Sequence, residues 1–474
     1  MANSPAETPY DLTVLGAGPA GLAAATSAAT AGARVALIDA GNHPGGQYWR
    51  NRGGDDGALH HDWATFQALR LQLRAAGPAI DYLPRHSVWH IENTGTEFTA
   101  HASTPSGERI VTSRSLVVAT GAYDRQLPFP GWTLPGVFTA GALQALLKGQ
   151  GVLAGRRIAV SGTGPFLLAV AAGLADAGAD VVGVFEAGHP AGFARHLGAV
   201  ARNAAKLGEG VEYSLTMLRR RIPYHTRTAI VAAHGHEEVA GVTTAKLDRN
   251  WNPVPGTEKQ IDCDTVAVGY GFTPQLEIPL QLGCQTRRDI DGSLIAVADT
   301  GQRSTVPGVY LAGEVCGVSG AAASVVEGRL AGLHAAAAVT GVAPTPKLLR
   351  KLERHRAALH AFAVAMHATF PVPSGWTGWL RPDTVICRCE EVETADVDAA
   401  IEDLGAIDPR AVKLYARPGM GMCQGRVCGF ATTCLVAARA DREPTADDLR
   451  GVASRPIGQP VSLRSLAAGA ERTP

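Results

Sequence analysis

The feature that most constrains the fold lies at residues 11–21, which read DLTVLGAGPAG. Apolar residues before the first glycine predict a short buried strand, and Gly16, Gly18 and Gly21 follow with G-x-G-x-x-G spacing. The first glycine permits a tight turn, the second lets the backbone approach a pyrophosphate, and the third allows the next helix to pack close to the strand. The alanine-rich run 22–31 predicts that helix, with its N-terminal N–H groups facing the phosphates.

A second predicted strand, 34–38, ends at Asp39. This acid lies about 20 residues past the glycines, where a ribose hydroxyl is expected to be held. Strand, turn, helix, strand and acid therefore occur in order, which favours a bound dinucleotide over a glycine-rich turn in an empty α/β domain. A further strand, 115–119, is expected to return to the nucleotide at Thr120 and Gly121.

The chain then repeats this pattern, and such repeats indicate duplicated units. A strand at 157–161 leads into Gly162, Thr163, Gly164 and Pro165, and the next strand ends at Glu186. Residues 269–271 occupy the place that 119–121 held in the first copy. We expect two copies of one α/β unit, with the second inserted into the first.

Composition excludes some classes of function. Lys+Arg and Asp+Glu balance at 43 each, so nothing indicates a nucleic-acid partner. The first residues lack a secretory pattern, and Glu327 and Arg329 interrupt the apolar stretch 319–343. We expect a cytoplasmic protein with no transmembrane segment.

The inserted copy is expected to close with a strand that ends at Gly313 and Glu314. Here the chain resembles the two-dinucleotide-domain flavoproteins related to glutathione reductase. The resemblance implies FAD in the first copy, with the Gly-acid pair on the ribityl chain and the loop at 45–47 beside the flavin. Glu314 is one methylene longer than the aspartate commoner in that family. The contacts that the resemblance implies are Gly16, Gly18, Pro19, Ala20, Gly21, Asp39, Ala40, Gly45, Gly46, Gln47, Val88, Thr120, Gly121, Gly313 and Glu314.

The second nucleotide site departs from the pattern, because Leu167 stands where the third glycine would be. Gly162, Gly164, Pro165 and Glu186 remain as candidate contacts for NAD or an adenine nucleotide. The alternative is a retained domain that serves as scaffold. The reactive Cys pair of disulfide reductases is missing from the first copy, so the flavin must pass its electrons elsewhere.

Four cysteines form a separate constellation near the C-terminus. Cys387 and Cys389 are two residues apart and expected on a loop, whereas Cys423 and Cys428 are expected to straddle the start of a helix. This C-x-C…C-x4-C module resembles the bacterioferritin-associated-ferredoxin-like modules, which implies a 2Fe–2S cluster on these cysteines. Structural zinc and unligated thiols stay open as alternatives. Cys434 is left over as a core cysteine.

The predicted fold is α/β, with two Rossmann-like domains of glutathione-reductase type and a small helical 2Fe–2S domain. The expected boundaries are 1–150 and 300–343 for the FAD domain, 151–299 for the second Rossmann-like domain, 344–382 for a helix and linker, and 383–474 for the 2Fe–2S domain and tail.

The combination resembles the α-type subunits of heteromeric amino-acid and opine dehydrogenases, on motifs such as 119–125 (ATGAYDR) and 128–132 (PFPGW). That family includes components of hydrogen cyanide synthase, opine oxidase and some proline and hydroxyproline dehydrogenases. The resemblance implies electron transfer from an amino-acid-oxidase-like flavoprotein partner, and it leaves room for a small third subunit and a membrane electron-transport acceptor. Trp376 and Trp379 of the linker are candidates to dock the partner.

Two other functions stay open, a self-sufficient NAD-dependent flavoprotein and a non-catalytic metal-binding protein. Arg125 is the one obvious candidate to grip a substrate carboxylate, and no catalytic residue is assigned.

Overall fold

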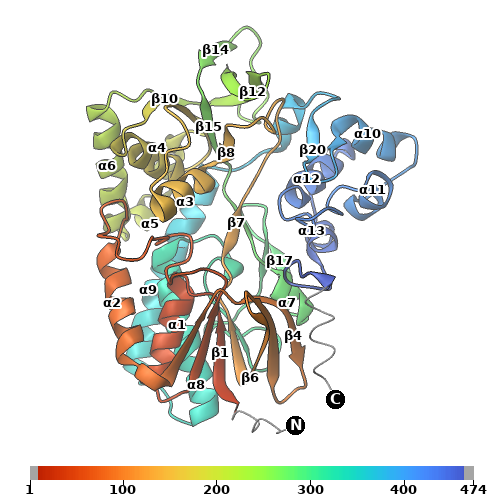
Figure 1. The fold of residues 1–474 in the computed structure, drawn as a ribbon. Helices are drawn as coiled ribbons and strands as arrows, with labels where there is room; N and C mark the ends of the chain where they lie inside the picture. Colours follow the sequence, from red (N-terminus) through yellow and green to blue (C-terminus); the bar gives the residue numbers. More distant parts are fainter. Residues whose placement is uncertain (1–8, 464–474) are drawn as a thin grey trace.

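The computed structural model describes residues 9–463, apart from the side chains of residues 204–207. Expectations about residues 1–8 and 464–474 lie outside the described residues. Two α/β units lie one above the other in Figure 1, and a smaller C-terminal module packs beside them.

The first sheet has seven strands in the order β3-β2-β1-β6-β5-β4, with β19 also paired to β6. The parallel pairing of β1 with β2 and with β6 is the arrangement expected of a dinucleotide-binding unit. Its strands are β1 (Tyr10–Leu15), β2 (Val35–Asp39), β3 (Ile80–Pro84), β4 (Ser87–Asn93), β5 (Phe98–Thr104), β6 (Gly107–Val118) and β19 (Val309–Leu311).

Helices α1 (Pro19–Thr30) and α8 (Ala321–Thr340) pack tightly on one face of this sheet. A Cβ on Gly328 would lie 2.0 Å from the carbonyl oxygen of Ala20, and one on Gly332 would lie 2.2 Å from that of Ala24. Glycine at these two positions therefore lets the backbones touch, which fixes the start of α8 near the glycine turn. Helix α2 (Trp63–Ala75) and turn η1 (Gly77–Ala79) complete this layer.

The second sheet has the order β11-β10-β9-β15-β8. Its strands are β8 (Val137–Thr139), β9 (Arg157–Gly162), β10 (Asp180–Glu186), β11 (Tyr224–Thr226) and β15 (Thr265–Gly269). The same unit contains α3 (Ala140–Gln150), α4 (Phe166–Asp176), η2 (Pro190–His196), α5 (Leu197–Ala201) and α6 (Ala204–Arg219). A separate antiparallel sheet is formed by β12 (Thr228–Gly235), β13 (Val239–Lys246) and β14 (Lys259–Asp262).

Two details of this unit differ from the sequence prediction. The sequence also predicts one strand over 260–268, but the structure has two strands in different sheets there. The break falls at Asp264, whose carboxylate accepts hydrogen bonds from the backbone N–H of Arg156 and Arg157. The chain passes from the first unit to the second before β8 rather than at residue 150, since β8 pairs with β15 in the second sheet.

Elements after β15 return to the first unit before residue 300. Strand β16 (Phe272–Pro274) pairs with β7 (Ala122–Asp124). Helix α7 (Glu277–Gln281) and strands β17 (Thr286–Arg288) and β18 (Leu294–Ala296) follow, and their apolar side chains join the core on the first sheet.

Helix α9 (Pro346–Thr369) lies where the sequence predicts a helix, and it packs against α8. The segment after it contains η4 (Ser374–Trp379), where Trp376 and Trp379 are buried in the core of the second unit. The expectation that these tryptophans dock a partner is therefore wrong, because the core already covers them. None of the described helices combines the length and apolar character that a membrane crossing requires.

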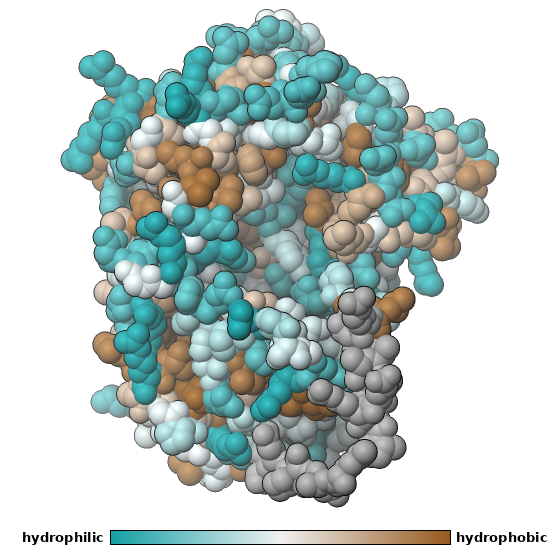
Figure 2. Space-filling view, viewed as in Figure 1, coloured by the Kyte–Doolittle hydropathy of each residue, from teal (hydrophilic) through white to brown (hydrophobic). Residues whose placement is uncertain are grey.

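The C-terminal module contains β20 (Val385–Cys387), β21 (Val392–Glu393), α10 (Thr394–Glu402), α11 (Pro409–Ala416), α12 (Gly429–Arg439) and α13 (Ala446–Ala453). It has its own small core around Ile386, Val397 and Leu435. Figure 2 shows a mostly hydrophilic face with scattered hydrophobic patches, and exposed apolar side chains of the module include Ile407 and Met422.

Candidate functional site

The first glycine turn has the close approaches that a dinucleotide site needs. A Cβ on Gly16 would lie 2.4 Å from the carbonyl oxygen of Ala119, and one on Gly21 would lie 1.7 Å from that of Gly16. Gly18 differs, because a Cβ there would meet only the Cα of Gly46, at 3.8 Å. The space in front of Gly18 is therefore free of protein at the N-terminus of α1, where a pyrophosphate is favoured.

The loop after β2 lies against this turn. The backbone N–H of Gly45 donates to the carbonyl of Ala17 at 2.8 Å, and a Cβ on Gly46 would lie 2.8 Å from the Cα of Gly18. Pro19 is the first residue of α1, whereas Ala40 and Gln47 are exposed. Val88 lies in β4 and packs against the apolar core.

Asp39 ends β2 beside the turn and holds it. Its carboxylate accepts hydrogen bonds from the backbone N–H of Ala17 and of Gly41. Burial raises the pKa of Asp39, and the two backbone hydrogen bonds and the charge of Arg50 oppose that shift. The carboxylate remains partly exposed, so a ribose could share it.

Two acids meet where β19 ends. Gly313 adopts a φ of +81°, and its N–H donates to the Glu327 carboxylate at 2.7 Å. Glu314 accepts a hydrogen bond from the backbone N–H of Gly320 at 2.9 Å, just before α8. Burial raises the pKa of Glu314 to about 7. The longer acid thus reaches the N-terminal end of α8.

The second glycine turn is arranged differently. Glu186 is 1% exposed, and its carboxylate accepts from the Thr163 hydroxyl and from the N–H of Gly164 and Gly188. Burial raises its pKa to about 7. A Cβ on Gly188 would lie 3.0 Å from the Phe370 ring, so the segment after α9 lies over this loop. The Glu186 carboxylate therefore stabilises its own glycine turn through these hydrogen bonds. This favours the interpretation of the unit as a scaffold over its interpretation as an NAD site.

Leu167, in the position of the missing glycine, is fully buried in the core of the second unit. Leu167→Ala is expected to lower the free energy of unfolding by about 2–5 kcal/mol, because it leaves a cavity where no backbone can close in. Urea unfolding measures the change. Leu218→Ala, at a position 74% exposed, is the control and should stay within about 0.5 kcal/mol. Equal effects of the two changes would contradict a packing role for Leu167.

The four predicted cysteines come together in the C-terminal module. The sulfurs of Cys389 and Cys423 are 3.4 Å apart, and the Cys428 thiol hydrogen-bonds with those of Cys387 and Cys423. Cys387 ends β20, Cys389 lies in the following turn, and Cys428 caps α12. Both cysteines of the second pair therefore precede the helix rather than straddling its first turn.

The loops around the sulfurs are shaped by glycine. A Cβ on Gly421 would lie 2.5 Å from the Cβ of Cys389, and one on Gly419 would lie 3.9 Å from the sulfur of Cys428. The N–H of Gly419 points at the sulfur of Cys387, at 3.4 Å. Backbone donors and close-fitting glycines around thiols suit a thiolate-bound group.

The thiols differ in acidity. The hydrogen bond from Cys428 lowers the pKa of Cys387 to about 6 and that of Cys423 to about 4. The same hydrogen bonds raise the pKa of Cys428, and burial raises that of Cys389. The four sulfurs form a chain of contacts. Within residues 9–463, no group of three or more His, Cys, Asp or Glu side chains is arranged to hold a metal ion.

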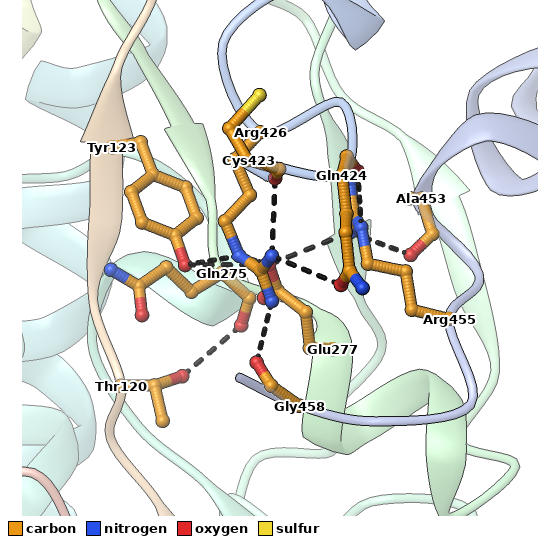
Figure 3. Close-up of polar contacts among 10 residues, drawn as sticks. All are labelled: Thr120, Tyr123, Gln275, Glu277, Cys423, Gln424, Arg426, Ala453, Arg455 and Gly458. Atoms are coloured by element: carbon orange, nitrogen blue, oxygen red, sulfur yellow. Dashed lines mark hydrogen bonds and ion pairs between the residues drawn. The ribbon is translucent and has the colours of Figure 1, made fainter. Parts of the chain in front are cut away.

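A polar network that the sequence did not reveal joins this module to the first unit (Figure 3). Arg426 lies between the cysteines of the second pair and ion-pairs with Glu277 at 2.8 Å, while its Nε also donates to the hydroxyl of Tyr123 at 3.0 Å. Arg455 approaches the same carboxylate at 3.4 Å. These residues line a cavity of about 50 Å³ between the module and strands β7 and β16. Only the position of Arg426 inside the cysteine motif could have pointed to it.

Arg125 has no free guanidinium to offer a substrate. It is 2% exposed, donates to the Asp291 carboxylate at 2.7 Å and lies 4.1 Å from the centre of the Phe430 ring. Its expected role as a candidate carboxylate-binding residue is therefore wrong, because the ion pair and the ring occupy it.

These features define a flavin-dependent oxidoreductase with two dinucleotide-type units. A model of the pyridine nucleotide-disulphide oxidoreductase family matches residues 10–339, and the chain belongs to this family. It is accordingly an FAD-dependent oxidoreductase.

Relatives extend over almost the whole chain. It is 32% identical over 481 residues to a subunit of the opine oxidase of Agrobacterium tumefaciens (strain Ach5), covering 97% of this chain and 91% of that one. It is 34% identical over 424 residues to the HcnB subunit of the hydrogen cyanide synthase of Pseudomonas aeruginosa, covering 88% and 90%. The resemblance to this group predicted from the sequence is confirmed. In fold it resembles L-proline dehydrogenase from P. horikoshii, with 20% identity, a TM-score of 0.70 and coverage of 97% and 79%.

Proposed function

We propose that this chain is the electron-transfer subunit of a heteromeric dehydrogenase or oxidase that acts on the C–N bond of an amino acid or opine. It would hold FAD at the first glycine turn and a 2Fe–2S cluster on Cys387, Cys389, Cys423 and Cys428. When bound, FAD takes up two electrons and the cluster passes them on singly.

The FAD site would use the free space before Gly18, with the N-terminus of α1 toward the pyrophosphate. Asp39 would hold the ribose, and Thr120 and Gly121 would border the nucleotide. Gly313 and Glu314 would lie toward the ribityl chain. For the cluster, the gathered thiols and the N–H of Gly419 aimed at the Cys387 sulfur suit thiolate ligation. The C-x-C and C-x4-C spacing of these cysteines departs from the C-x2-C pairs that are common in zinc ribbons, which favours the two-iron centre over zinc.

The observation that carries the proposal is the short polar route between the two sites. The Thr120 hydroxyl donates to the carbonyl of Gln275 at 3.1 Å, and the Gln275 N–H donates to the carbonyl of Gly121 at 2.9 Å. Two residues further along the chain, Glu277 pairs with Arg426, which donates to the carbonyl of Cys423 at 3.1 Å. Figure 3 shows this route between the end of β6 and the cysteine loop.

The substrate is proposed to be oxidised on a partner. The relatives are named as subunits of an opine oxidase and of hydrogen cyanide synthase, which supports a heteromeric assembly. Arg125 is occupied by Asp291, and oxidising an amino acid requires a free cation that holds its carboxylate. We infer that the partner is an amino-acid-oxidase-like flavoprotein in the cytoplasm, in an assembly with room for a small third subunit and with a membrane electron-transport acceptor.

The test is to assay the purified chain alone, with FAD and iron verified, on proline, hydroxyproline, glycine and opines with an artificial acceptor. No turnover above background is expected until the partner is added, because Arg125, the candidate to hold the substrate carboxylate, is paired with Asp291. NADH should likewise leave the flavin oxidised. Turnover by the chain alone at saturating substrate would overturn the assignment of chemistry to the partner.

A further inference from the structure

The network between the module and the first unit buries more positive than negative charge. The side chains of Arg426, Arg455 and Glu277 are 8%, 9% and 6% exposed. Tyr123 stays neutral there, since burial raises its pKa to about 12. Two guanidinium groups therefore share one carboxylate, and the group has a net positive charge that solvent screens poorly.

This charge lies against the cysteine loop. The Nε of Arg455 donates to the carbonyl of Gln424 at 2.6 Å, and a Cβ on Gly425 would lie 3.5 Å from its guanidinium. Arg455 and the Cys423 sulfur interact electrostatically. Elsewhere around the cysteines, Glu390 and Arg417 form an ion pair at 3.0 Å. The buried, uncompensated charge of Arg426 and Arg455 thus lies where the cysteine loop meets the first unit.

We propose that Arg455 and Arg426 raise the reduction potential of the centre held by the four cysteines, and that Glu277 lowers it by offsetting part of their charge. This inference rests on the proposed function, because it requires a cluster on these thiols. The new content is that these three residues set the electron affinity of the proposed cluster, which would accept electrons from the flavin.

The physical reason is electrostatic. A cluster held by four thiolates is anionic, and one electron from the reduced flavin makes it more negative without breaking or forming a bond to these residues. Net charge and burial are among the factors that set the potentials of such centres. A cation in a poorly screened site stabilises the reduced form, whereas a nearby carboxylate opposes it.

The experiment is an anaerobic redox titration of the purified holoprotein, followed by the EPR signal of the reduced cluster. Arg455→Gln is expected to disfavour reduction at least tenfold, a shift of ~59 mV to lower potential for one electron. Glu277→Gln is expected to shift the potential in the opposite direction, because it removes the only carboxylate of the network. Arg455→Lys keeps the charge and should stay close to the unmodified protein.

Arg439→Gln is the matched control, because Arg439 lies in the same module but pairs with Asp398 at 2.7 Å, outside the network. The reduction potential of the cluster in this variant should equal that of the unmodified protein. The inference would be overturned if Arg455→Gln and Glu277→Gln shifted the potential in the same direction or not at all. A purely structural role of these residues would not shift the potential in opposite directions. Protein without iron and sulfide would instead refute the proposed cluster, and the inference with it.

Discussion

Cys389→Ser is expected to strip the protein of iron while leaving it folded and flavin-bound. Cys389 is exposed, so serine there disturbs no core, but a hydroxyl is a far poorer ligand for iron than a thiolate. Its sulfur contacts Cys423, and its loss removes one end of the chain of thiols. Iron and acid-labile sulfide per chain should fall to near zero, and the EPR signal after dithionite reduction should disappear.

The control for this change is Cys434→Ala. Cys434 lies on α12 in the same module, but it packs against the core of the second unit rather than joining the four thiols. Iron should stay at the level of the unmodified protein. If Cys389→Ser kept its full iron, or if the unmodified chain contained stoichiometric zinc and no iron, the proposed cluster would be refuted.

Gly18→Val is expected to abolish FAD binding without unfolding the first unit. A Cβ at Gly18 meets no protein atom closer than 3.8 Å, and its φ of −74° is accessible to any residue. The added methyl groups would fill the space that a pyrophosphate needs. Flavin absorbance per chain should fall by an order of magnitude or more, since a lost 1.4 kcal/mol of binding is already about tenfold.

Gly173→Val is the matched control, because a Cβ there meets no atom outside its own helix backbone within 4 Å, and the helix lies in the second unit, away from the first turn. It should retain flavin, and circular dichroism should report the same secondary structure in both variants. A folded Gly18→Val protein with full flavin absorbance would show that the dinucleotide lies elsewhere.

The sequence by itself determined the parts of this protein that depend on local backbone geometry. The close approaches at Gly16 and Gly21 exclude a side chain, Gly18 leaves space for a pyrophosphate, and a similar glycine turn after 162 reveals the second copy. Each cysteine pair is likewise close in sequence, and the resemblance of the whole motif predicted that the two pairs meet. The residues of each turn and of each pair lie within a few positions of one another, so they could be recognised without the fold.

Only the tertiary structure decided which side chains meet across the chain. Tyr123 and Arg426 are 303 residues apart, and Arg125 and Asp291 are 166 apart. The same holds for Trp379, which donates to the carbonyl of Trp251 in the second unit and is therefore unavailable to a partner. An arginine or tryptophan has the same local preferences whether it is buried in an ion pair, packed in a core or exposed, so its contacts are decided only when distant segments pack. That packing placed Glu277 between two arginines and joined the end of β6 to the cysteine loop.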